Sequence, residues 1–587
     1  MSELFEVTDT ADRRLALSAS GLLSEFNQAG VLTAADVHVA IRVGRLTGES
    51  DERVLLAAAL AVRAVRLGSV CADLAAVADV APDLPWPSYG EWTAAVTESP
   101  LLTAGVLRWE FDLLYLDRYW HQEVALCRDL ESRIAQPTPV VDEPRLERGL
   151  PRVFPGETYG EQREASRRAA SAWTTVLTGG PGTGKTTTVA GLLALLAEQA
   201  AGAGAPPLRI ALTAPTGKAA ARLQEAVARE VARFPGTDRD RLGPLQAVTL
   251  HRLLGTRRDN GTRFRHHRGN RLPHDVVVVD ESSMVSLTMM TRLVEAVRPE
   301  SRLILVGDPD QLASVDAGAV LADLVSGLSA RDRSPVVRLA TTHRFGEEIG
   351  ALAAALRDGS ADAVLDVLRG GAAEVEFVES DDPAAVLRSR VVEAAVDVRR
   401  HAKAGDADAA VAALDRHRLL CAHRDGPYGV QHWNRQVEHW LSEETGDPLY
   451  EPMYVGRPLL VTANDYGLGV YNGDAGVVVR TEAGPRAFVN GSQGLADFAT
   501  SRMSDVETMF ATTIHKSQGS QAEEVTVLLP PPDSRLLTRE LFYTAVTRAQ
   551  RKVRVVGTED SVRAAVDRRA LRASGLRQRL SGDRCRP

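Results

Sequence analysis

Residues 174–186 read TTVLTGGPGTGKT, and this stretch decides the fold around it. A β-branched run over 174–178 is followed at once by a glycine-rich segment and then by a helical pattern over 187–199. A buried strand, a glycine-rich loop and a helix in this order are typical of the P-loop of nucleoside triphosphatases. The stretch therefore predicts an α/β domain that binds a nucleotide.

The residue types in the loop suit phosphate binding. Glycines let backbone N–H groups turn toward phosphate oxygens, and the start of the following helix adds a partial positive charge. In this pattern Lys185 reaches the β- and γ-phosphates, and the hydroxyl of Thr186 binds Mg²⁺. A chance glycine-rich turn is the alternative, and the register of strand, loop and helix disfavours it. The predicted phosphate-binding residues are Gly179, Gly180, Pro181, Gly182, Thr183, Gly184, Lys185 and Thr186.

An acidic pair, Asp280 and Glu281, follows a second apolar run that reads DVVVVD over 275–280. We expect Asp280 to bind Mg²⁺ and Glu281 to polarise the water that attacks the γ-phosphate. Alone, such a pair could be a surface turn. It lies about 95 residues after the P-loop lysine, at the end of a strand that is expected to be parallel. The two motifs together predict hydrolysis of ATP with Mg²⁺.

Two sets of apolar runs predict two α/β domains. Strands of a parallel sheet are covered by helices on both faces, so they read as continuous apolar runs. Residues 456–503 instead combine glycine and asparagine with short β-type runs, which predicts a small β insertion. The further runs are 208–213, 275–280 and 302–306 in the first domain, and 418–421, 524–529 and 552–556 in the second.

The N-terminal part of the chain predicts a helical domain without a catalytic site. Residues 51–67 place apolar side chains three and four apart, with acids in the first turn and arginines in the last. Five prolines between 135 and 155 predict a linker without any regular element. The predicted division is a helical domain over 1–135, a linker over 136–156, and α/β domains over 157–345 and 346–587, with the insertion at about 456–505.

The composition excludes several classes of protein. The 587 residues are 44% hydrophobic and 25% charged, as in globular chains and unlike disordered or fibrous ones. No stretch reaches the roughly 18 uncharged apolar residues that a membrane helix needs. Four widely separated cysteines suggest neither a disulfide framework nor a metal site, and a net charge of −8 requires any nucleic-acid site to be local. We expect a cytoplasmic protein without a membrane partner.

The segments around these motifs resemble the motifs of superfamily 1 DNA helicases, in the same order, over residues 157–558. Residues 161–163 (EQR) are similar to the Q motif, in which Gln162 would bind adenine. Residues 214–223 (APTGKAAARL) resemble motif Ia, and residues 249–255 (TLHRLLG) resemble the motif that follows it. A helix cap explains Thr216 equally well. The resemblance implies DNA contacts for Pro215, Thr216, Gly217 and His251.

The resemblance continues into the second predicted domain. Residues 306–312 (VGDPDQL) resemble motif III, in which Gln311 would link the γ-phosphate to bound DNA. Residues 343–345 (HRF) and 541–550 (LFYTAVTRAQ) resemble motifs IV and VI, which implies that Arg344 and Arg548 are arginine fingers on the γ-phosphate. Residues 511–523 (ATTIHKSQGSQAE) resemble motif V, which implies DNA contacts for His515, Lys516 and Ser517.

Two segments outside those motifs are similar to the RecD family, the alpha subunits of RecBCD enzymes (exonuclease V). They are residues 419–430 (LLCAHRDGPYGV) and 456–476 (GRPLLVTANDYGLGVYNGDAG). The resemblance implies two RecA-like domains, an SH3-like insertion that touches DNA, an N-terminal domain that docks on RecC, and movement from 5′ to 3′ along DNA. The basic stretch 257–271 is either a DNA-contacting loop or a solvated loop of the first domain.

The predicted function is that of an ATP-dependent DNA helicase, the motor subunit of a heterotrimer with RecB and RecC that processes broken DNA ends. No cluster of Asp, Glu and Lys predicts a nuclease site, so we expect the nuclease activity in RecB. Two alternatives stay open. One is a free-standing RecD-like helicase, which usually carries a longer N-terminal region. The other is an ATP-gated regulatory subunit that binds DNA without translocating.

Overall fold

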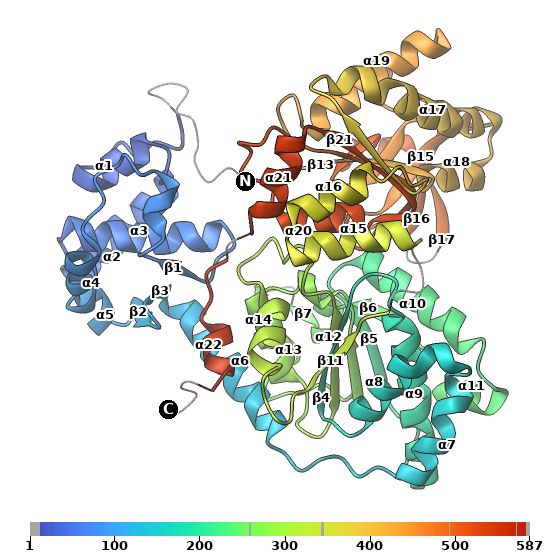
Figure 1. Ribbon diagram of the computed structural model, residues 1–587, viewed down its shortest axis with the longest axis horizontal. Coiled ribbons are helices and arrows are strands. Elements are labelled where there is room, and N and C mark those ends of the chain that lie inside the picture. The colour runs from blue at the N-terminus through green and yellow to red at the C-terminus, as the bar shows by residue number, and fades with distance from the viewer. Residues whose placement is uncertain are drawn as a thin grey trace.

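The structure is a computed structural model that describes residues 12–257, 260–341, 346–465, 467–491, 494–570 and 572–582; at 257 and 260–262 it describes the backbone only. Three lobes make up the molecule (Figure 1). An N-terminal lobe lies beside two α/β domains that are stacked on each other. No helix among the described residues is long and apolar enough to cross a membrane.

The first α/β domain is built on a six-stranded parallel sheet in the order β11-β4-β10-β9-β5-β6. Val276 and Val278 face the core under α8, α9 and α10, whereas Val277 and Val279 face the core under α13 and α14. Burial on both faces therefore explains the uninterrupted valine run. The strands are β4 (Thr174–Gly179), β5 (Ile210–Ala214), β6 (Ala247–Thr249), β9 (Val276–Val279), β10 (Arg302–Gly307) and β11 (Val336–Leu339).

The helices of this domain connect the strands and carry the loops that line the cleft between the domains. The P-loop lies between the end of β4 and the start of α9. The helices are α8 (Gly160–Ala170), α9 (Lys185–Gly202), α10 (Gly217–Val231), α11 (Gly236–Leu242), α12 (Leu250–Leu254), α13 (Leu287–Ala296) and α14 (Val320–Leu328). A hairpin of β7 (Thr256–Arg257) and β8 (Asn260–Phe264) opens the basic stretch, in which Arg268 pairs with Asp129 of the N-terminal lobe.

The second α/β domain contains a five-stranded parallel sheet in the order β12-β21-β20-β13-β19. Its two faces are again covered by helices, α15, α16, α20 and α21 on one side and α17 and α19 on the other. The strands are β12 (Val375–Glu379), β13 (His417–Cys421), β19 (Ala511–Thr513), β20 (Ala522–Leu528) and β21 (Ala549–Gly557). The helices are α15 (Glu347–Asp358), α16 (Ala361–Arg369), α17 (Pro383–Ala404), α18 (Ala407–Leu414), α19 (Val430–Thr445), α20 (Arg539–Val546) and α21 (Glu559–Asp567).

The predicted β insertion forms a five-stranded antiparallel sheet in the order β17-β16-β15-β14-β18. It has a small core of its own, and it packs through β15 on α17 and α18. The strands are β14 (Pro458–Val461), β15 (Ala475–Thr481), β16 (Gly484–Gly491), β17 (Gly494–Ala499) and β18 (Val506–Thr508).

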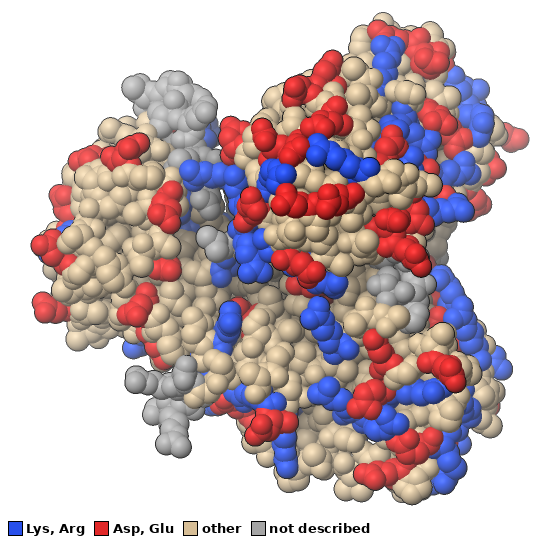
Figure 2. Space-filling model, in the orientation of Figure 1, with Lys and Arg blue, Asp and Glu red and all other residues tan. Residues whose placement is uncertain are grey.

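The N-terminal lobe is mainly helical but also holds a three-stranded antiparallel sheet in the order β1-β3-β2. Trp92 and Phe26 are buried in its core. Acidic side chains prevail on its visible face (Figure 2). Its elements are α1 (Gly21–Gln28), α2 (Ala34–Thr47), α3 (Glu52–Arg66), β1 (Cys71–Asp73), α4 (Tyr89–Thr97), α5 (Pro100–Thr103), β2 (Leu107–Glu110), β3 (Leu113–Leu116) and α6 (Asp117–Ile134).

The proline-rich segment 136–156 corrects one prediction, because it contains helix α7 (Glu143–Val153). Pro144 lies in the first turn, where its missing N–H breaks no helical hydrogen bond. Pro151 lies inside the helix, but Leu146, Leu150 and Val153 form a buried face that packs on α9. The gain from burying this face outweighs the loss of one backbone hydrogen bond.

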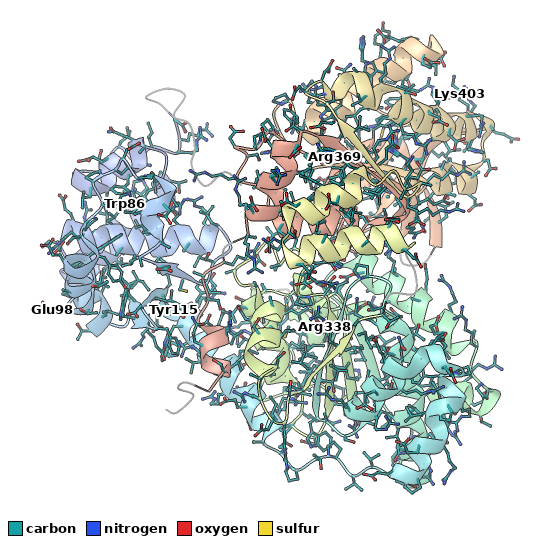
Figure 3. The ribbon with its side chains drawn as sticks, viewed as in Figure 1. Trp86, Glu98, Tyr115, Arg338, Arg369 and Lys403 are labelled. Atoms are coloured by element: carbon teal, nitrogen blue, oxygen red, sulfur yellow. The ribbon has the colours of Figure 1, made fainter. Side chains whose placement is uncertain are left out.

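The C-terminal end of the chain also departs from the predicted division. Helix α22 (Leu576–Leu580) leaves the second domain and packs on α14 and α6, where Leu576 and Leu580 join the core of the first domain. Figures 1 and 3 show this segment between the N-terminal lobe, near Tyr115, and the first domain. The sequence prediction placed these residues in the second domain, because motif spacing says nothing about where a tail docks.

A buried ionic cluster holds this C-terminal segment, which we call the strap (residues 572–582). The guanidinium group of Arg579 lies 3.3 Å from Glu123 and 2.6 Å from Glu110. The Ser574 hydroxyl donates to Glu123 over 2.8 Å. Burial raises the pKa of Glu123 above its usual value. The strap is therefore fixed to the N-terminal lobe by a buried ion pair between Arg579 and Glu123, and Glu110 extends this pair toward the surface.

We expect Arg579→Met to destabilise the chain by about 3–5 kcal/mol, because it leaves the buried Glu123 carboxylate without its opposite charge. Differential scanning calorimetry of the full chain measures the effect. Arg563→Met is the matched control, since Arg563 forms exposed ion pairs with Asp362 and Glu559, and an unchanged melting temperature is expected there. Equal melting temperatures for the two variants would contradict the role given to the cluster.

Candidate functional site

A cavity of about 1120 Å³ lies between the two α/β domains and gathers most of the predicted nucleotide-site residues. The first domain supplies its floor from the P-loop and from the ends of β9 and β10. The second domain closes it with Arg548. The predicted residues that line it are Gln162, Pro181, Gly182, Gly184, Lys185, Thr186, Asp280, Glu281, Gln311 and Arg548.

The P-loop backbone turns through two glycines with positive φ, Gly182 at 81° and Gly184 at 83°. Other residues are strained in this conformation, so the loop requires glycine there. The Lys185 ammonium group donates to the carbonyl oxygens of Gly179 and Gly180 over 2.6 and 2.8 Å. It therefore lies over the loop, beside the backbone groups that are expected to bind phosphate.

Two side chains stabilise the P-loop by hydrogen bonds to its backbone carbonyls. The Thr183 hydroxyl donates to the Gly180 carbonyl over 2.9 Å. The amide of Gln162, which is fully buried, donates to the Thr183 carbonyl over 3.1 Å. Gln162 thus contacts the P-loop directly, in addition to lining the cavity. Gly179 and Gly180 line a neighbouring cavity instead of the main one.

The acidic pair lies where β9 ends. Burial and the nearby charge of Glu281 raise the pKa of Asp280 to about 7. Glu281 has a φ of 50°, a conformation that is rare for residues other than glycine and is often found at functional sites. The Thr186 hydroxyl and the half-buried Asp280 carboxylate are oxygen ligands of the kind that Mg²⁺ prefers. The described residues contain no cluster of three His, Cys, Asp or Glu side chains that could hold a different metal.

The loop after β10 connects the cavity to the second domain. Its residue Gln311 donates to Oδ2 of Asp308 over 3.1 Å. The N–H of Leu312 donates to the Thr544 hydroxyl over 2.9 Å, and the side chain of Gln518 donates to the Leu312 carbonyl over 2.8 Å. The same loop thus reaches the nucleotide cavity and is hydrogen-bonded to both motif V and motif VI.

Arg548 is buried at the end of α20, with 4% of its surface exposed. Its guanidinium group donates to the Thr544 carbonyl over 3.1 Å and to the Ser520 carbonyl over 3.4 Å. Burial lowers the pKa of Arg548, while Glu281 and Asp308 counteract the shift by their negative charge. The other predicted arginine finger, Arg344, lies outside the described residues.

The predicted DNA contacts of motif Ia lie at the end of β5. The Thr216 hydroxyl accepts from the N–H of Ala219 over 3.2 Å, so it caps α10 as the alternative interpretation held. A Cβ added to Gly217 would lie 3.1 Å from Cβ of Tyr471, a residue of the insertion. Pro215 is half-buried beside them. The insertion therefore contacts motif Ia.

Motif V lies at the end of β19 and also approaches motif Ia. A Cβ on Gly519 would lie 3.5 Å from Cβ of Ala219, which places the two motifs side by side. Lys516 is exposed and pairs with Glu507 over 2.9 Å. The buried Ser517 hydroxyl donates to the Ile514 carbonyl over 2.7 Å, and burial lowers the pKa of His515 to about 4.

His251 lies apart, on α12 beyond the edge strand β6 of the first domain. Its ring packs against Phe264 at 5.9 Å between centroids. Burial lowers the pKa of His251 below its usual value.

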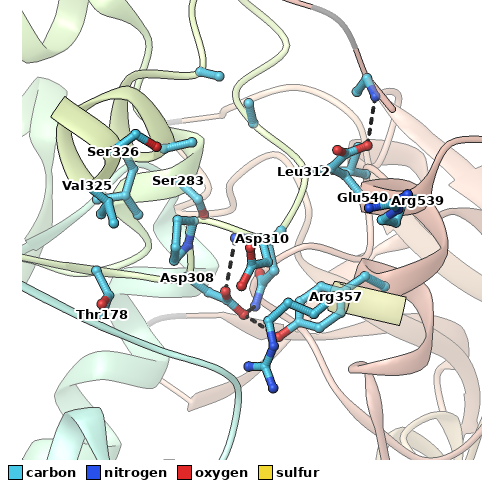
Figure 4. Close-up of a pocket in the computed structure, with 18 of the residues that line it drawn as sticks. Thr178, Ser283, Asp308, Asp310, Leu312, Val325, Ser326, Arg357, Arg539 and Glu540 are labelled. Atoms are coloured by element: carbon cyan, nitrogen blue, oxygen red, sulfur yellow. Dashed lines mark hydrogen bonds between the residues drawn. The ribbon is translucent and has the colours of Figure 1, made fainter. Parts of the chain in front are cut away.

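A second cavity, of about 660 Å³, lies on the other side of the loop after β10 (Figure 4). Thr178 and Ser283 line it from the first domain, and Arg357 lines it from the second. Burial and the neighbouring Asp308 raise the pKa of Asp310 to about 6. The loop is therefore enclosed between two cavities.

Sequence reasoning did not single out Asp308, Tyr543 or Arg222, although all three lie at this interface. Asp308 and Tyr543 stand inside the segments that were compared with motifs III and VI. The hydrogen bond between these two side chains joins the two domains, so neither sequence segment alone contains a pattern that predicts it. Arg222 lines the nucleotide cavity from α10, inside the segment that was compared with motif Ia, and could have been noticed from its place on the helix.

Three family models match the chain. The model described as "AAA domain" matches residues 162–317, and the model described as "UvrD-like helicase C-terminal domain" matches residues 508–556. The model described as "RecBCD enzyme subunit RecD, N-terminal domain" matches residues 28–140. The first match covers the P-loop and the acidic pair, and the second covers motifs V and VI.

Proteins similar over almost the whole chain are named RecBCD enzyme subunit RecD. The relative from Mycobacterium tuberculosis is 62% identical over 581 residues, which cover 98% of this chain and 99% of the relative. That from Mycolicibacterium smegmatis is 62% identical and covers 94% and 98%. The ATP-dependent RecD2 DNA helicase of Deinococcus radiodurans is 29% identical over 82% of this chain and 61% of its own length. The chain therefore belongs to the family of RecD subunits of RecBCD enzymes.

Proposed function

We propose that the chain is an ATP-dependent 5′ to 3′ DNA helicase and single-stranded-DNA-dependent ATPase, the motor subunit of a RecBCD-type helicase–nuclease that processes double-strand break ends. One observation carries the proposal. The cavity between the domains holds Lys185 and Glu281 from one side and Arg548 from the other. A site split between two domains changes shape when its ligand arrives, which a motor requires.

The roles of the site residues follow from their positions. Lys185 and the P-loop amides bind the phosphates, and Gln162 supports the loop that carries them. Thr186 and Asp280 would hold Mg²⁺, which offsets the charge of the phosphates when bound. Glu281 orients the attacking water. Arg548 contacts the γ-phosphate from the second domain, where a planar guanidinium can donate two parallel hydrogen bonds.

The DNA strand runs over the motifs at the ends of the strands. Motif Ia (residues 214–223) belongs to the first domain and motif V (residues 511–523) to the second, and they lie next to each other at Ala219 and Gly519. His251 contacts the same DNA strand further along the first domain. If the two motifs grip the backbone in turn while the cleft opens and closes, each cycle of ATP hydrolysis advances the domains along the strand.

The partners in this proposal are DNA, RecB and RecC, with the assembly in the cytoplasm. The N-terminal lobe has a hydrophobic core of its own, which suits a docking role toward RecC. RecB would supply the nuclease, so that the heterotrimer degrades linear DNA. The name that the mycobacterial relatives carry, RecBCD enzyme subunit, supports this assembly.

Lys185→Gln should reduce ATP hydrolysis in the presence of single-stranded DNA to background, because the neutral amide cannot offset the phosphate charge. The rate of phosphate release at saturating single-stranded DNA measures this loss of ATP hydrolysis. Lys403→Gln is the matched control, since Lys403 pairs with Asp447 on the outer side of the second domain (Figure 3). Wild-type turnover in the Lys185 variant would refute the assignment of the P-loop.

Arg548→Lys should lower kcat about a thousandfold, within the range for arginine fingers, while the affinity for ATP changes only a few-fold. Lysine keeps the charge but cannot form the bidentate contact. Steady-state kinetics separates kcat from KM. Arg369→Lys, at an exposed site paired with Glu379 and Glu559, should behave as wild type. An unchanged kcat in Arg548→Lys would remove Arg548 from the reaction.

Co-expression with RecB and RecC from the same genome should give a ternary complex in gel filtration. The complex should unwind a duplex end when ATP and Mg²⁺ are present. Elution of the chain alone, with strand displacement from a 5′-tailed duplex, would instead indicate a free-standing helicase. ATPase activity without strand displacement, alone or in the complex, would indicate a regulatory subunit.

A further inference from the structure

One buried carboxylate oxygen is shared by the two domains. Oδ2 of Asp308 accepts a hydrogen bond from the phenol of Tyr543 over 2.9 Å and another from the amide of Gln311 over 3.1 Å. Gln311 belongs to the loop of the first domain, and Tyr543 belongs to α20 of the second. Figure 4 shows Asp308 between the ribbons of the two domains, with hydrogen bonds drawn to its carboxylate.

Tyr543 also touches the P-loop. A Cβ added to Gly180 would lie 3.3 Å from the Tyr543 hydroxyl, so the phenol borders the loop that is expected to hold the phosphates. The tyrosine side chain is almost fully buried, with 2% of its surface exposed. Burial and the charge of Asp308 raise its pKa, which keeps the hydroxyl a donor. Its position therefore joins the phosphate loop, Asp308 and the second domain.

Two further hydrogen bonds join the loop after β10 to the second domain. Leu312, next to Gln311, donates to Thr544, which is next to Tyr543, over 2.9 Å. Gln518 of motif V donates to the Leu312 carbonyl over 2.8 Å. A shift of α20 relative to the first domain must therefore move the loop that carries Gln311.

The shared oxygen explains why Tyr543 matters for Gln311. With two donors, the charge of Asp308 is divided between them, and the Gln311 amide can exchange this contact for a phosphate oxygen at a moderate cost. Without the phenol, Oδ2 of the same buried carboxylate keeps the Gln311 amide as its donor and holds that amide more strongly, while Oδ1 still accepts from the N–H of Asp310 over 3.1 Å. The orientation of Gln311 thus depends on a side chain of the other domain.

We propose that Tyr543 is a positioning residue that acts through Asp308 to set Gln311, and so transmits the DNA-bound state of the second domain to the nucleotide cavity. The inference rests on the function proposed above. It predicts that Tyr543 affects how strongly DNA stimulates hydrolysis and has little effect on ATP binding, because the phenol contacts the backbone of the P-loop and not the cavity that receives the nucleotide.

The test compares Tyr543→Phe with the wild-type full chain in steady-state ATPase assays, with and without single-stranded DNA. We expect the DNA-stimulated kcat to fall about tenfold, the size of effect of one hydrogen bond to a charged group. KM for ATP should stay within about twofold. Tyr454→Phe is the matched control, because Tyr454 is also buried and donates to a carboxylate, Glu438, over 3.0 Å, away from the cleft. That variant should keep wild-type stimulation.

A second comparison shows whether Tyr543 acts through Gln311. In a Gln311→Ala background, Tyr543→Phe should have no additional effect on the stimulated rate, since the group it positions is absent. Multiplied losses would overturn the proposal, and so would wild-type stimulation in Tyr543→Phe. If Tyr543→Phe melts at a lower temperature, Asp308→Asn replaces it in the same cycle, and the same two outcomes decide.

The outcomes separate this inference from the proposed function. A wild-type chain that hydrolyses no ATP, or that DNA does not stimulate, would overturn the proposed function and the role of Tyr543 with it. A stimulated wild type with an equally stimulated Tyr543→Phe variant would overturn only the role of Tyr543.

Discussion

Desolvated charge in the cleft between the two α/β domains is the constraint on which the molecule depends. Asp308 is buried and Asp280 is half-buried, and Arg548, which approaches them from the second domain, is buried as well. Charges removed from water are costly unless partners of opposite sign and hydrogen-bond donors surround them. Here part of that compensation comes from the opposite domain. The stability of the closed arrangement is therefore sensitive to any ligand that adds or removes charge in the cleft.

The strap restricts which motions the second domain can make. After α21 the chain leaves that domain, and α22 is fixed in the first domain and the N-terminal lobe by Leu576, Leu580 and Arg579. The strap also contacts the loop after motif III, since Arg572 donates to the carbonyls of Ser314 and Asp316. The two domains are thus joined at the strap as well as through the connection between β11 and α15.

The sequence was most informative where function depends on neighbouring residues. The P-loop, the acidic pair and the two parallel sheets were predictable, because glycine spacing, a four-valine strand and alternating elements are local patterns. Helix α7 was not predicted, because the five prolines of this segment argue against a helix. Its apolar residues, spaced three and four apart, nevertheless form a buried helical face. The small sheet of the N-terminal lobe was missed because its strands, such as Cys71–Asp73, are only three or four residues long.

Contacts between distant segments could not be predicted in this way. Tyr543 and Asp308 are 235 residues apart, and nothing in either segment says which buried hydroxyl faces which carboxylate. The docking of α22 could not be predicted for the same reason, since the paired residues Glu123 and Arg579 are 456 residues apart in the sequence. Motif resemblance named Gln311 and Arg548, but the structure alone shows that Tyr543 donates to the same carboxylate oxygen as Gln311 and borders the P-loop.

This arrangement suggests how occupancy of the nucleotide site reaches the other domain. The Lys185 ammonium group is held by the carbonyls of Gly179 and Gly180, and an arriving phosphate chain offers it a charged partner in their place. Gly180 is the residue that Tyr543 borders. When Lys185 turns to the phosphates, the backbone of the loop adjusts slightly. This movement changes the position of the Tyr543 phenol, and through Asp308 it changes the position of Gln311. Packed interfaces of this kind shift between discrete arrangements instead of deforming gradually, so an exchange of hydrogen bonds at this interface favours one arrangement of the domains over another.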